Sequence, residues 1–252
     1  MPILLNAAQV LKCFSAECSD LTVSDVAARL SMPKANASRL LKAMRGAGLL
    51  ETIGETKRHR PGRLLLDLAA AYRGSSPLIK RAGEVLAEVN RSFGHTGYVT
   101  VRDGREVTAV LDCPGTNALR VVSSIGRRLP AHLSATGRTL LARLGDAEVR
   151  RIYDGHPAAA ALPAILADVR RRGFAHSSQE TTAGVDAIAV AVGDPATAEL
   201  VSLCVVYPSA VVAAADRDAM IHALIGGAAR IAVALGDTGF VRTDVEGKET
   251  PE

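Results

Sequence analysis

Three short helical patterns in the first 48 residues constrain the fold of this chain more than any other stretch. Apolar residues recur at helical spacing over residues 5–14, which predicts a first helix. Thr22 and Asp25 have the spacing of a capping box, in which two side chains satisfy backbone N–H groups at the start of a second helix. Pro33 is accepted only in the first turn of a helix, so a third helix is predicted over 33–47, with Gly48 as its stop. Short helices in this order predict a helix-turn-helix.

The third helix is expected to have an apolar face and a polar, basic face. Its apolar stripe is Ala37, Leu40, Leu41 and Met44, at helical spacing. The other side carries Ala35 and two cations, with polar side chains on its flanks. If this helix enters the major groove of DNA, the residues that would contact it are Lys34, Asn36, Ser38, Arg39 and Lys42.

Two short strands are predicted to follow, as a β-hairpin wing around a basic tip. The first covers residues 49–53, and Pro61-Gly62 ends the second. The tip residues Lys57, Arg58, His59 and Arg60 would then contact phosphates. The alternative is that the helix face and the tip are simply solvated, charged surfaces.

The charge distribution favours a polyanion partner for the first third of the chain. The whole chain has a net charge of +4, but residues 1–75 hold 11 Lys and Arg against 6 Asp and Glu. The remainder holds 19 basic against 20 acidic residues. An excess confined to the segment with the helix-turn-helix pattern is typical of double-stranded DNA binding.

Two helices are predicted to connect this segment to the rest of the chain. The first lies within residues 63–76 and ends at Gly74-Ser-Ser-Pro77, where we place a domain boundary. The second is amphipathic and runs from Leu78 to Asn90. The alternative is that both are core helices of one larger domain.

Residues 77–236 are predicted to form an α+β domain with a mixed antiparallel sheet. Asp103-Gly104 has the form of a hairpin turn, and Asp194-Pro195 lies in another. Strands are expected at 97–101, 106–111, 119–122, 185–192 and 199–207, and helices at 138–144, 148–153, 163–173 and 215–235. Residues 237–252 are polar and acidic, and we expect a disordered tail there.

Composition narrows the class of protein further. The four cysteines are scattered without a Cys-x-x-Cys pair, which is typical of reduced thiols in a cytoplasmic protein. No N-terminal signal is visible, and the longest apolar run, 200–215, contains Pro208 and is too short to span a membrane. The six histidines show no metal-ligand spacing, and no catalytic or phosphate-binding motif is present. We therefore expect no enzyme activity, no metal, no cofactor and no membrane.

Residues 126–144 have a pattern that suits either packing or ligand binding. Small residues, Ser134 to Gly137, occupy the predicted first turn of a helix. Such residues let a helix N-terminus, with its unpaired N–H groups, approach a small ligand closely. They also suit a helix that packs tightly under a sheet, and the residues alone favour that second interpretation.

Two blocks of the sequence resemble the IclR family of bacterial transcription regulators. GRRLPAHLSATGRTLLARL at 126–144 is similar to the family's LPxHx(S/T)AxG(R/K)xLLA run. RRRGFAHSSQETTAGVDAIAVAV at 170–192 resembles a second family pattern, and the segment from Leu21 to Gly48 resembles its winged helix. The resemblance implies an N-terminal winged helix-turn-helix domain (1–62), a linker helix (63–76) that helps pair two protomers, and a C-terminal GAF-like α/β effector-binding domain (77–236).

The resemblance also implies an effector site, carried over position by position. It assigns ligand contacts to Ala135, Thr136, Gly137, Ser177, Val185, Ala187, Cys204 and Val206. Several family members have Ser, Cys or Asp on the final strand, whereas this chain has mostly apolar or weakly polar side chains there. We therefore expect a larger, partly apolar effector, such as an aromatic metabolite with its polar head at the 135–137 turn.

A second departure lies in the wing. The family usually has an aromatic residue and a Leu-Gly pair after the wing, whereas this chain has His59-Arg-Pro-Gly62. From this we expect a return strand that is shorter or more mobile.

The sequence thus predicts an effector-responsive DNA-binding regulator that is a homodimer or tetramer. The alternatives are a small-molecule enzyme with an accessory helical domain, and an architectural DNA-binding protein without an effector.

Overall fold

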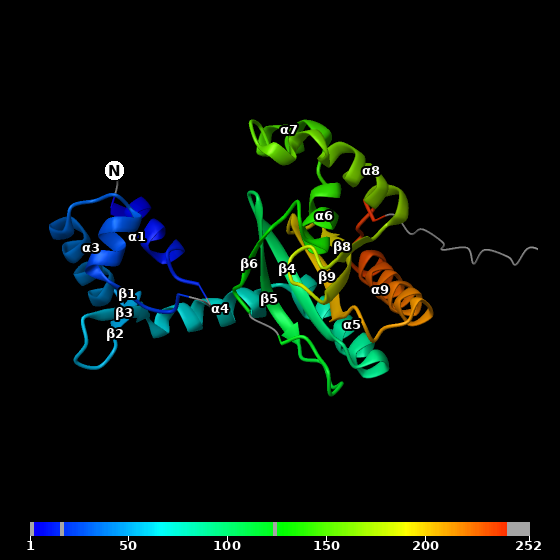
Figure 1. The fold of residues 1–252 in the computed structure, drawn as a ribbon, viewed down its shortest axis with the longest axis horizontal. Helices are drawn as coiled ribbons and strands as arrows, with labels where there is room; N and C mark the ends of the chain where they lie inside the picture. Colours follow the sequence, from blue (N-terminus) through cyan, green and yellow to red (C-terminus); the bar gives the residue numbers. More distant parts are fainter. Residues whose placement is uncertain (1–2, 16–17, 123–124, 241–252) are drawn as a thin grey trace, which may run out of the picture. The chain divides into compact units, whose positions relative to one another are not determined.

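The protein forms two compact units, Met1–Ser76 and Pro77–Glu252. The structure is a computed structural model and describes residues 3–15, 18–122 and 125–240. Figure 1 shows the order of the elements along the chain. Each unit is described by itself.

The first unit contains the predicted helix-turn-helix and wing. Three helices surround a small apolar core that includes Val10, Val26, Leu41 and Met44. The sheet has three antiparallel strands in the order β1-β3-β2. The elements are α1 (Ile3–Lys12), β1 (Leu21–Thr22), α2 (Val23–Arg29), α3 (Lys34–Gly46), β2 (Leu50–Thr52), β3 (Arg58–Pro61) and α4 (Arg63–Ser75).

Local signals set the ends of these helices. The Thr22 hydroxyl accepts a hydrogen bond from the Asp25 N–H, and the Asp25 carboxylate accepts one from the Thr22 N–H at 2.8 Å, so the predicted capping box is present. Ser31 has a φ of 50°, a left-handed conformation that lets the chain turn between α2 and α3. Gly48, with a φ of 77°, follows the end of α3.

The second unit is α+β and is built on one six-stranded antiparallel sheet. The strand order is β6-β5-β4-β9-β8-β7. The strands are β4 (Thr96–Asp103), β5 (Glu106–Cys113), β6 (Arg128–Pro130), β7 (Ala175–Ser178), β8 (Val185–Asp194) and β9 (Glu199–Pro208). The helices are α5 (Pro77–Phe93), α6 (Ala135–Ala142), α7 (Asp146–Ile152), the 3-10 turn η1 (Pro157–Ala160), α8 (Leu162–Arg172) and α9 (Ala214–Leu235).

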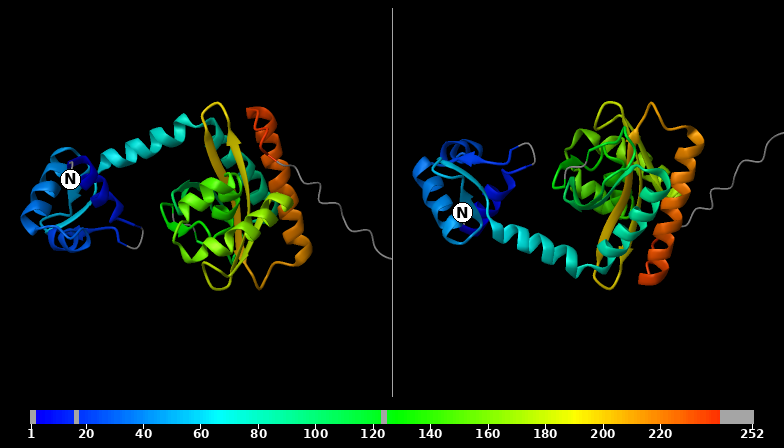
Figure 2. Two further views of the ribbon diagram at one scale, coloured as in Figure 1. Left: turned by 90° about the horizontal axis from the view of Figure 1, so that it is seen from above. Right: turned by 90° about the horizontal axis from the view of Figure 1, so that it is seen from below.

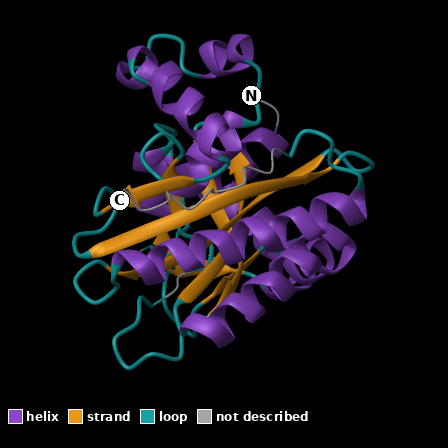
Figure 3. Cartoon of the chain, turned by 90° about the vertical axis from the view of Figure 1, so that its right-hand side faces the viewer, coloured by secondary structure: helices purple, strands orange, loops and turns teal. Residues whose placement is uncertain are grey.

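Helices cover both faces of this sheet (Figures 2 and 3). On one face α5 and α9 pack on the large side chains of β8 and β9, such as Ile188, Val190 and Leu203. On the other face α6 and α8 pack on smaller ones, including Ala189 and Ala191. Because side chains alternate along a strand, β8 presents a bulky face to α9 and a small one to α6. The small face leaves room for a buried helix and for the cavity beside it.

Some predicted elements differ in the structure. Residues 119–122 form no strand and pair with none of the strands of the sheet, and Leu119 and Val122 are 59% and 82% exposed. The edge strands β6 and β7 were not predicted. Within residues 237–240, which were expected in the disordered tail, Asp237 is instead buried, at 8% exposed, and Phe240 packs against the core. The remaining tail residues, 241–252, lie outside the described residues.

Among the described residues, α9 is the one helix long and apolar enough to cross a membrane by length and composition. Eight of its residues are buried, and it packs against α5 and β8. These contacts are those of a core helix. All four cysteines are free thiols.

Candidate functional site

The polar face of α3 is exposed, while its apolar stripe is buried in the core of the first unit. All five residues predicted on this face, Lys34, Asn36, Ser38, Arg39 and Lys42, are exposed. Arg39 Nη2 donates a hydrogen bond to Asn36 Oδ1 at 2.6 Å, which orders two of the polar side chains relative to each other. Lys34 and Lys42 have no ion pair within the described part of the chain. The face therefore presents uncompensated positive charge.

The wing differs from the prediction at His59. The turn lies at 54–57, and residues 58–61 form the return strand β3 rather than a tip. Because side chains alternate along β3, Arg58 and Arg60 point outward and His59 points inward, where it is 7% exposed. Burial, together with the charge of Arg45, lowers the pKa of His59. His59 is thus a core residue in this structure, and the prediction that it contacts DNA was wrong.

The two outward arginines of β3 are held by carboxylates. Arg58 forms an ion pair with Asp20, and Arg60 donates to Glu51 at 3.0 Å. The hydrogen bond from Arg60 lowers the pKa of Glu51. β3 has four residues and pairs with both β1 and β2, so the return strand is hydrogen-bonded on both edges. Lys57, in the turn, is exposed.

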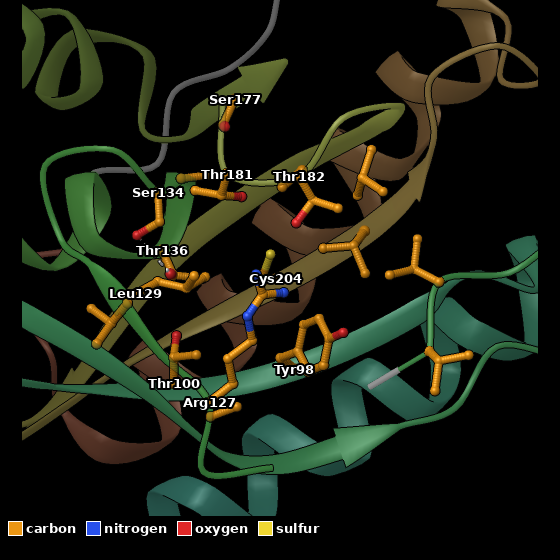
Figure 4. Close-up of a pocket in the computed structure, with 18 residues that line it drawn as sticks. Tyr98, Thr100, Arg127, Leu129, Ser134, Thr136, Ser177, Thr181, Thr182 and Cys204 are labelled. Atoms are coloured by element: carbon orange, nitrogen blue, oxygen red, sulfur yellow. Dashed lines mark hydrogen bonds between the residues drawn. The ribbon is translucent and has the colours of Figure 1, made fainter. Parts of the chain in front are cut away.

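A cavity of about 90 Å³ lies in the second unit, between the small-residue face of the sheet and α6 (Figure 4). Strands β4, β5, β8 and β9 form its floor, and the first turn of α6 forms one wall. The loops before β6 and between β7 and β8 supply its rim. The lining residues are Tyr98, Thr100, Val107, Ala109, Val121, Val122, Arg127, Leu129, Ser134, Ala135, Thr136, Ser177, Thr181, Thr182, Val185, Ala187, Cys204 and Val206.

Ser134 caps the first turn of α6 beside the cavity. Its hydroxyl accepts a hydrogen bond from the Gly137 N–H at 3.1 Å, which satisfies one of the free N–H groups of the helix end. Gly137 itself does not line the cavity. A Cβ at Gly137 would lie 2.2 Å from the Ala131 carbonyl oxygen, so this glycine permits the close contact between α6 and the 130–132 turn.

The cavity is mostly apolar, with hydroxyls on one side and one charge. Of the described residues that line it, Arg127 alone carries a formal charge, and its side chain points into the cavity (Figure 4). The hydroxyl-bearing side chains of Ser134, Thr136, Thr181 and Thr182 also line it (Figure 4). Burial raises the pKa of the Cys204 thiol to about 12, so the part of the floor that Cys204 forms is neutral at physiological pH. Such a lining suits a ligand with an apolar body and an anionic head.

The structure brings together seven of the eight positions predicted for the effector site, all except Gly137. The sequence analysis missed Arg127, Tyr98, Thr100 and the two threonines of the β7–β8 loop. A signal existed for two of them, because Tyr98 and Thr100 alternate along one predicted strand and must share a face. The only sequence signal for Arg127 was the short basic run in which it lies.

The described residues around the cavity form no metal-ligand cluster. The described residues contain no group of three His, Cys, Asp or Glu side chains able to hold a metal. His132 packs its ring against Tyr153 and His156, with centroids 5.7 and 4.9 Å away. These ring contacts make His132 a packing residue in this structure, and Ser134 is the cap of α6. The buried Nδ1 of His132 has no hydrogen-bond partner among the described residues.

Two protein-family descriptions match the chain. "Bacterial transcriptional regulator IclR C-terminal" matches residues 70–233, and "IclR helix-turn-helix domain" matches residues 4–54. The chain belongs to the IclR family. It is a transcription regulator of this type, with an N-terminal helix-turn-helix domain and a C-terminal effector-binding domain, as the sequence predicted.

Relatives and solved structures agree with this family. The Escherichia coli K12 protein named HTH-type transcriptional regulator XynR is 32% identical over 205 residues, which are 76% of this chain and 81% of XynR. An IclR regulator from Silicibacter superposes with a TM-score of 0.83 at 25% identity, covering 93% of this chain and 96% of that one. An IclR homologue from Microbacterium hydrocarbonoxydans, solved with 4-hydroxybenzoate, has a TM-score of 0.73 at 25% identity and covers 94% of this chain and 100% of that one.

Proposed function

We propose that this IclR regulator binds its operator through α3 and the wing. The observation that carries the proposal is the face of α3 opposite its buried apolar stripe, which is exposed and carries the basic and polar side chains. Asn36, Ser38 and Arg39 would contact base edges, and Lys34 and Lys42 would contact phosphates at the edges of the groove. Lys57 in the turn and Arg58 and Arg60 on β3 would contact the neighbouring phosphates.

The operator-binding species is proposed to be a homodimer or a tetramer. α4 has no buried residue, and α1 has one, Val10. A helix this short gains most of its stability from packing an apolar face, so both helices need a partner. The exposed apolar side chains available for it are Ile3, Leu4, Leu5, Leu64, Leu66, Leu68 and Tyr72. A second copy of the same surface would bury them and present two recognition helices to two half-sites.

The effector is proposed to be a small aromatic or otherwise partly apolar carboxylate. Arg127 would bind the carboxylate, helped by the Ser134 and Thr136 hydroxyls and the N-terminus of α6. The apolar floor, including Val206 and Cys204, would hold the body. The homologue solved with 4-hydroxybenzoate supports this chemical class. Effector binding would change operator affinity through a coupling free energy, and the protein would act in the cytoplasm without catalysing a reaction.

A salt titration tests the DNA-binding part. Binding to the duplex upstream of the protein's own gene would be measured for wild type, Arg39→Ala, Lys42→Ala and the control Lys80→Ala, an exposed lysine of the second unit. We expect Arg39→Ala to weaken specific binding by about 1–3 kcal/mol and Lys42→Ala to lower the salt slope by about one. Wild-type affinity equal for that duplex and a random one would exclude autoregulation. No binding to any duplex would refute the proposal.

Calorimetric titration tests the effector. 4-Hydroxybenzoate and glyoxylate would be titrated into wild type, Arg127→Gln and Arg128→Gln, the last being a neighbouring arginine that pairs with Glu106 outside the cavity. We expect the aromatic acid to bind wild type and Arg128→Gln similarly and Arg127→Gln about tenfold or more weakly, because a charge-assisted hydrogen bond is lost. Tight glyoxylate binding with no binding of aromatic acids would refute the proposed ligand class.

A further inference from the structure

The connection between β7 and β8, residues 179–184, has a defined shape although it is neither helix nor strand. The Gln179 N–H donates to the Val185 carbonyl at 2.9 Å, and the Gln179 side-chain oxygen accepts from the Gly184 N–H at 3.0 Å. The Val185 N–H donates to the Thr182 carbonyl at 3.2 Å. Gln179 and Gly184 have φ values of 56° and 75°. These bonds make the segment a compact loop whose position depends on how the loop as a whole is anchored.

The anchor is a bidentate ion pair with α6. Arg138 Nη1 donates to Glu180 Oε1 at 2.8 Å, and Nη2 donates to Oε2 of the same carboxylate at 2.5 Å. Arg138 Nε donates to the His132 carbonyl at 2.9 Å, so all three guanidinium nitrogens are used. The planar fork of a bidentate pair fixes orientation as well as distance.

The pair differs from the ordinary surface ion pairs of this unit. The Arg138 side chain is 12% exposed and that of Glu180 35%, whereas Arg128 and Glu106 are 40% and 50% exposed and joined by one contact. Exposed pairs contribute little because water and side-chain entropy offset the attraction. Arg138, with a side chain that is 12% exposed and a hydrogen bond from each guanidinium nitrogen, can hold the loop in one place.

Neither Arg138 nor Glu180 lines the cavity, but each adjoins residues that do. Ser134, Ala135 and Thr136 precede Arg138 in the first turn of α6, and Thr181 and Thr182 follow Glu180 in the loop. We infer that Arg138 and Glu180 are positioning residues of the effector pocket: their ion pair holds the 179–184 loop against the first turn of α6, so that the loop threonines face the ligand. The ligand-binding consequence rests on the proposed function of the cavity.

Hydrogen exchange in the ligand-free, full-length protein tests the inference without an effector. The variants are Glu180→Gln, which keeps the shape and removes the charge, and Arg138→Lys, which keeps the charge and removes the fork. Glu106→Gln is the control, because it breaks the exposed pair. We expect the Gln179, Gly184 and Val185 amides to exchange about tenfold faster in Glu180→Gln and somewhat less fast in Arg138→Lys. The exchange rates of the α9 amides should not change in either variant. In the Glu106→Gln control, the loop amides should exchange at the wild-type rate.

Unchanged exchange at these amides in both variants would overturn the inference. So would acceleration spread equally over the whole unit, which would indicate a purely global loss of stability.

Titration with 4-hydroxybenzoate separates the inference from the function on which it rests. If wild type binds the probe, we expect Glu180→Gln to bind about tenfold more weakly and Glu106→Gln to bind as wild type does. Equal binding by wild type and Glu180→Gln, with the loop amides accelerated, would contradict positioning for the ligand. If wild type does not bind the probe, the proposed ligand class fails, and the exchange result alone decides whether the pair positions the loop.

Discussion

The two units differ in whether their proposed functional residues are exposed or buried. In α3 of the first unit, four of the thirteen residues are buried and the proposed DNA contacts lie on the exposed remainder. In α6 of the second unit, seven of the eight residues are buried, and two of them, Ala135 and Thr136, line the cavity. The first unit can therefore change its function without changing its core. In the second, the residues that build the site also hold the fold, so function and stability should change together.

The largest effect that this comparison predicts is for Gly137→Ala. The added Cβ would lie 2.2 Å from a backbone oxygen, an atom that cannot move without shifting the 130–132 turn. We expect a loss of about 3 kcal/mol in the unfolding free energy of the second unit, measured by denaturant titration, and weaker binding of the effector probe. The control is Gly226→Ala in α9, where no atom lies within 4 Å of the new Cβ and a small gain is expected. Equal unfolding free energies for Gly137→Ala and Gly226→Ala would contradict the conclusion that the site in the second unit also holds the fold.

A smaller, pH-dependent effect is expected for Asp237→Asn. The side chain of Asp237 is 3% exposed, and its carboxylate accepts hydrogen bonds from Arg143 at 3.0 Å and from the Gly193 N–H at 2.7 Å. Burial raises the pKa of Asp237, but the hydrogen bonds from Arg143 and Gly193 outweigh it, so the pKa lies below its ordinary value of 3.8. We expect a loss of about 2 kcal/mol at pH 7.

The sign of the pH dependence follows from the lowered pKa. A carboxylate whose folded-state pKa is depressed stabilises the fold above its unfolded pKa and loses that contribution as the pH falls through the folded pKa. The difference between wild type and Asp237→Asn should therefore be constant near neutral pH and shrink below about pH 4. Unfolding curves at several pH values check this, and a difference that grows on acidification would contradict it.

The next largest loss of stability is expected in the first unit, at the capping box of α2. Thr22→Ala removes the hydroxyl that accepts the Asp25 N–H, and should cost about 1 kcal/mol. Amide exchange in α2 and α3 measures it, and Thr22→Ser, which keeps the hydroxyl, is the control. Because α2 positions α3, operator affinity should fall as well. Loss of the cap without any change in exchange would show that packing alone fixes α2.

The smallest change in unfolding free energy is expected for the exposed residues of α3. Arg39→Ala and Lys42→Ala remove exposed side chains and should leave the unfolding free energy within about 0.5 kcal/mol of wild type while DNA binding falls. A large destabilisation by either variant would mean that the polar face of α3 is part of the core, contrary to the contrast between the units.

The same contrast explains what the sequence could predict. The first unit is specified by local signals, such as the capping box at Thr22 and the stop at Gly48, which act within a few residues. The error at His59 came from placing the turn three residues too late, and the alternation of Arg58, His59 and Arg60 becomes readable only once the strand start is known.

The cavity could be predicted only in part because it is assembled from distant segments. β6 and β7 are short edge strands that form by pairing with β5 and β8, and pairing between strands leaves little mark on a three- or four-residue sequence. Residues 119–122 contain β-branched and apolar side chains but have no neighbouring strand. Arg127 enters the site because the connection folds over the sheet, which no local pattern specifies.

The position of α6 has a mechanical consequence. The helix spans about 12 Å, with the pocket at its first turn and Arg143, held by the segment that follows α9, just beyond its last. Asp237 also accepts a hydrogen bond from the Gly193 N–H near the end of β8, so the end of α6, the end of β8 and the segment after α9 meet at one carboxylate. A shift of α6 along its axis would have to be absorbed at this shared junction.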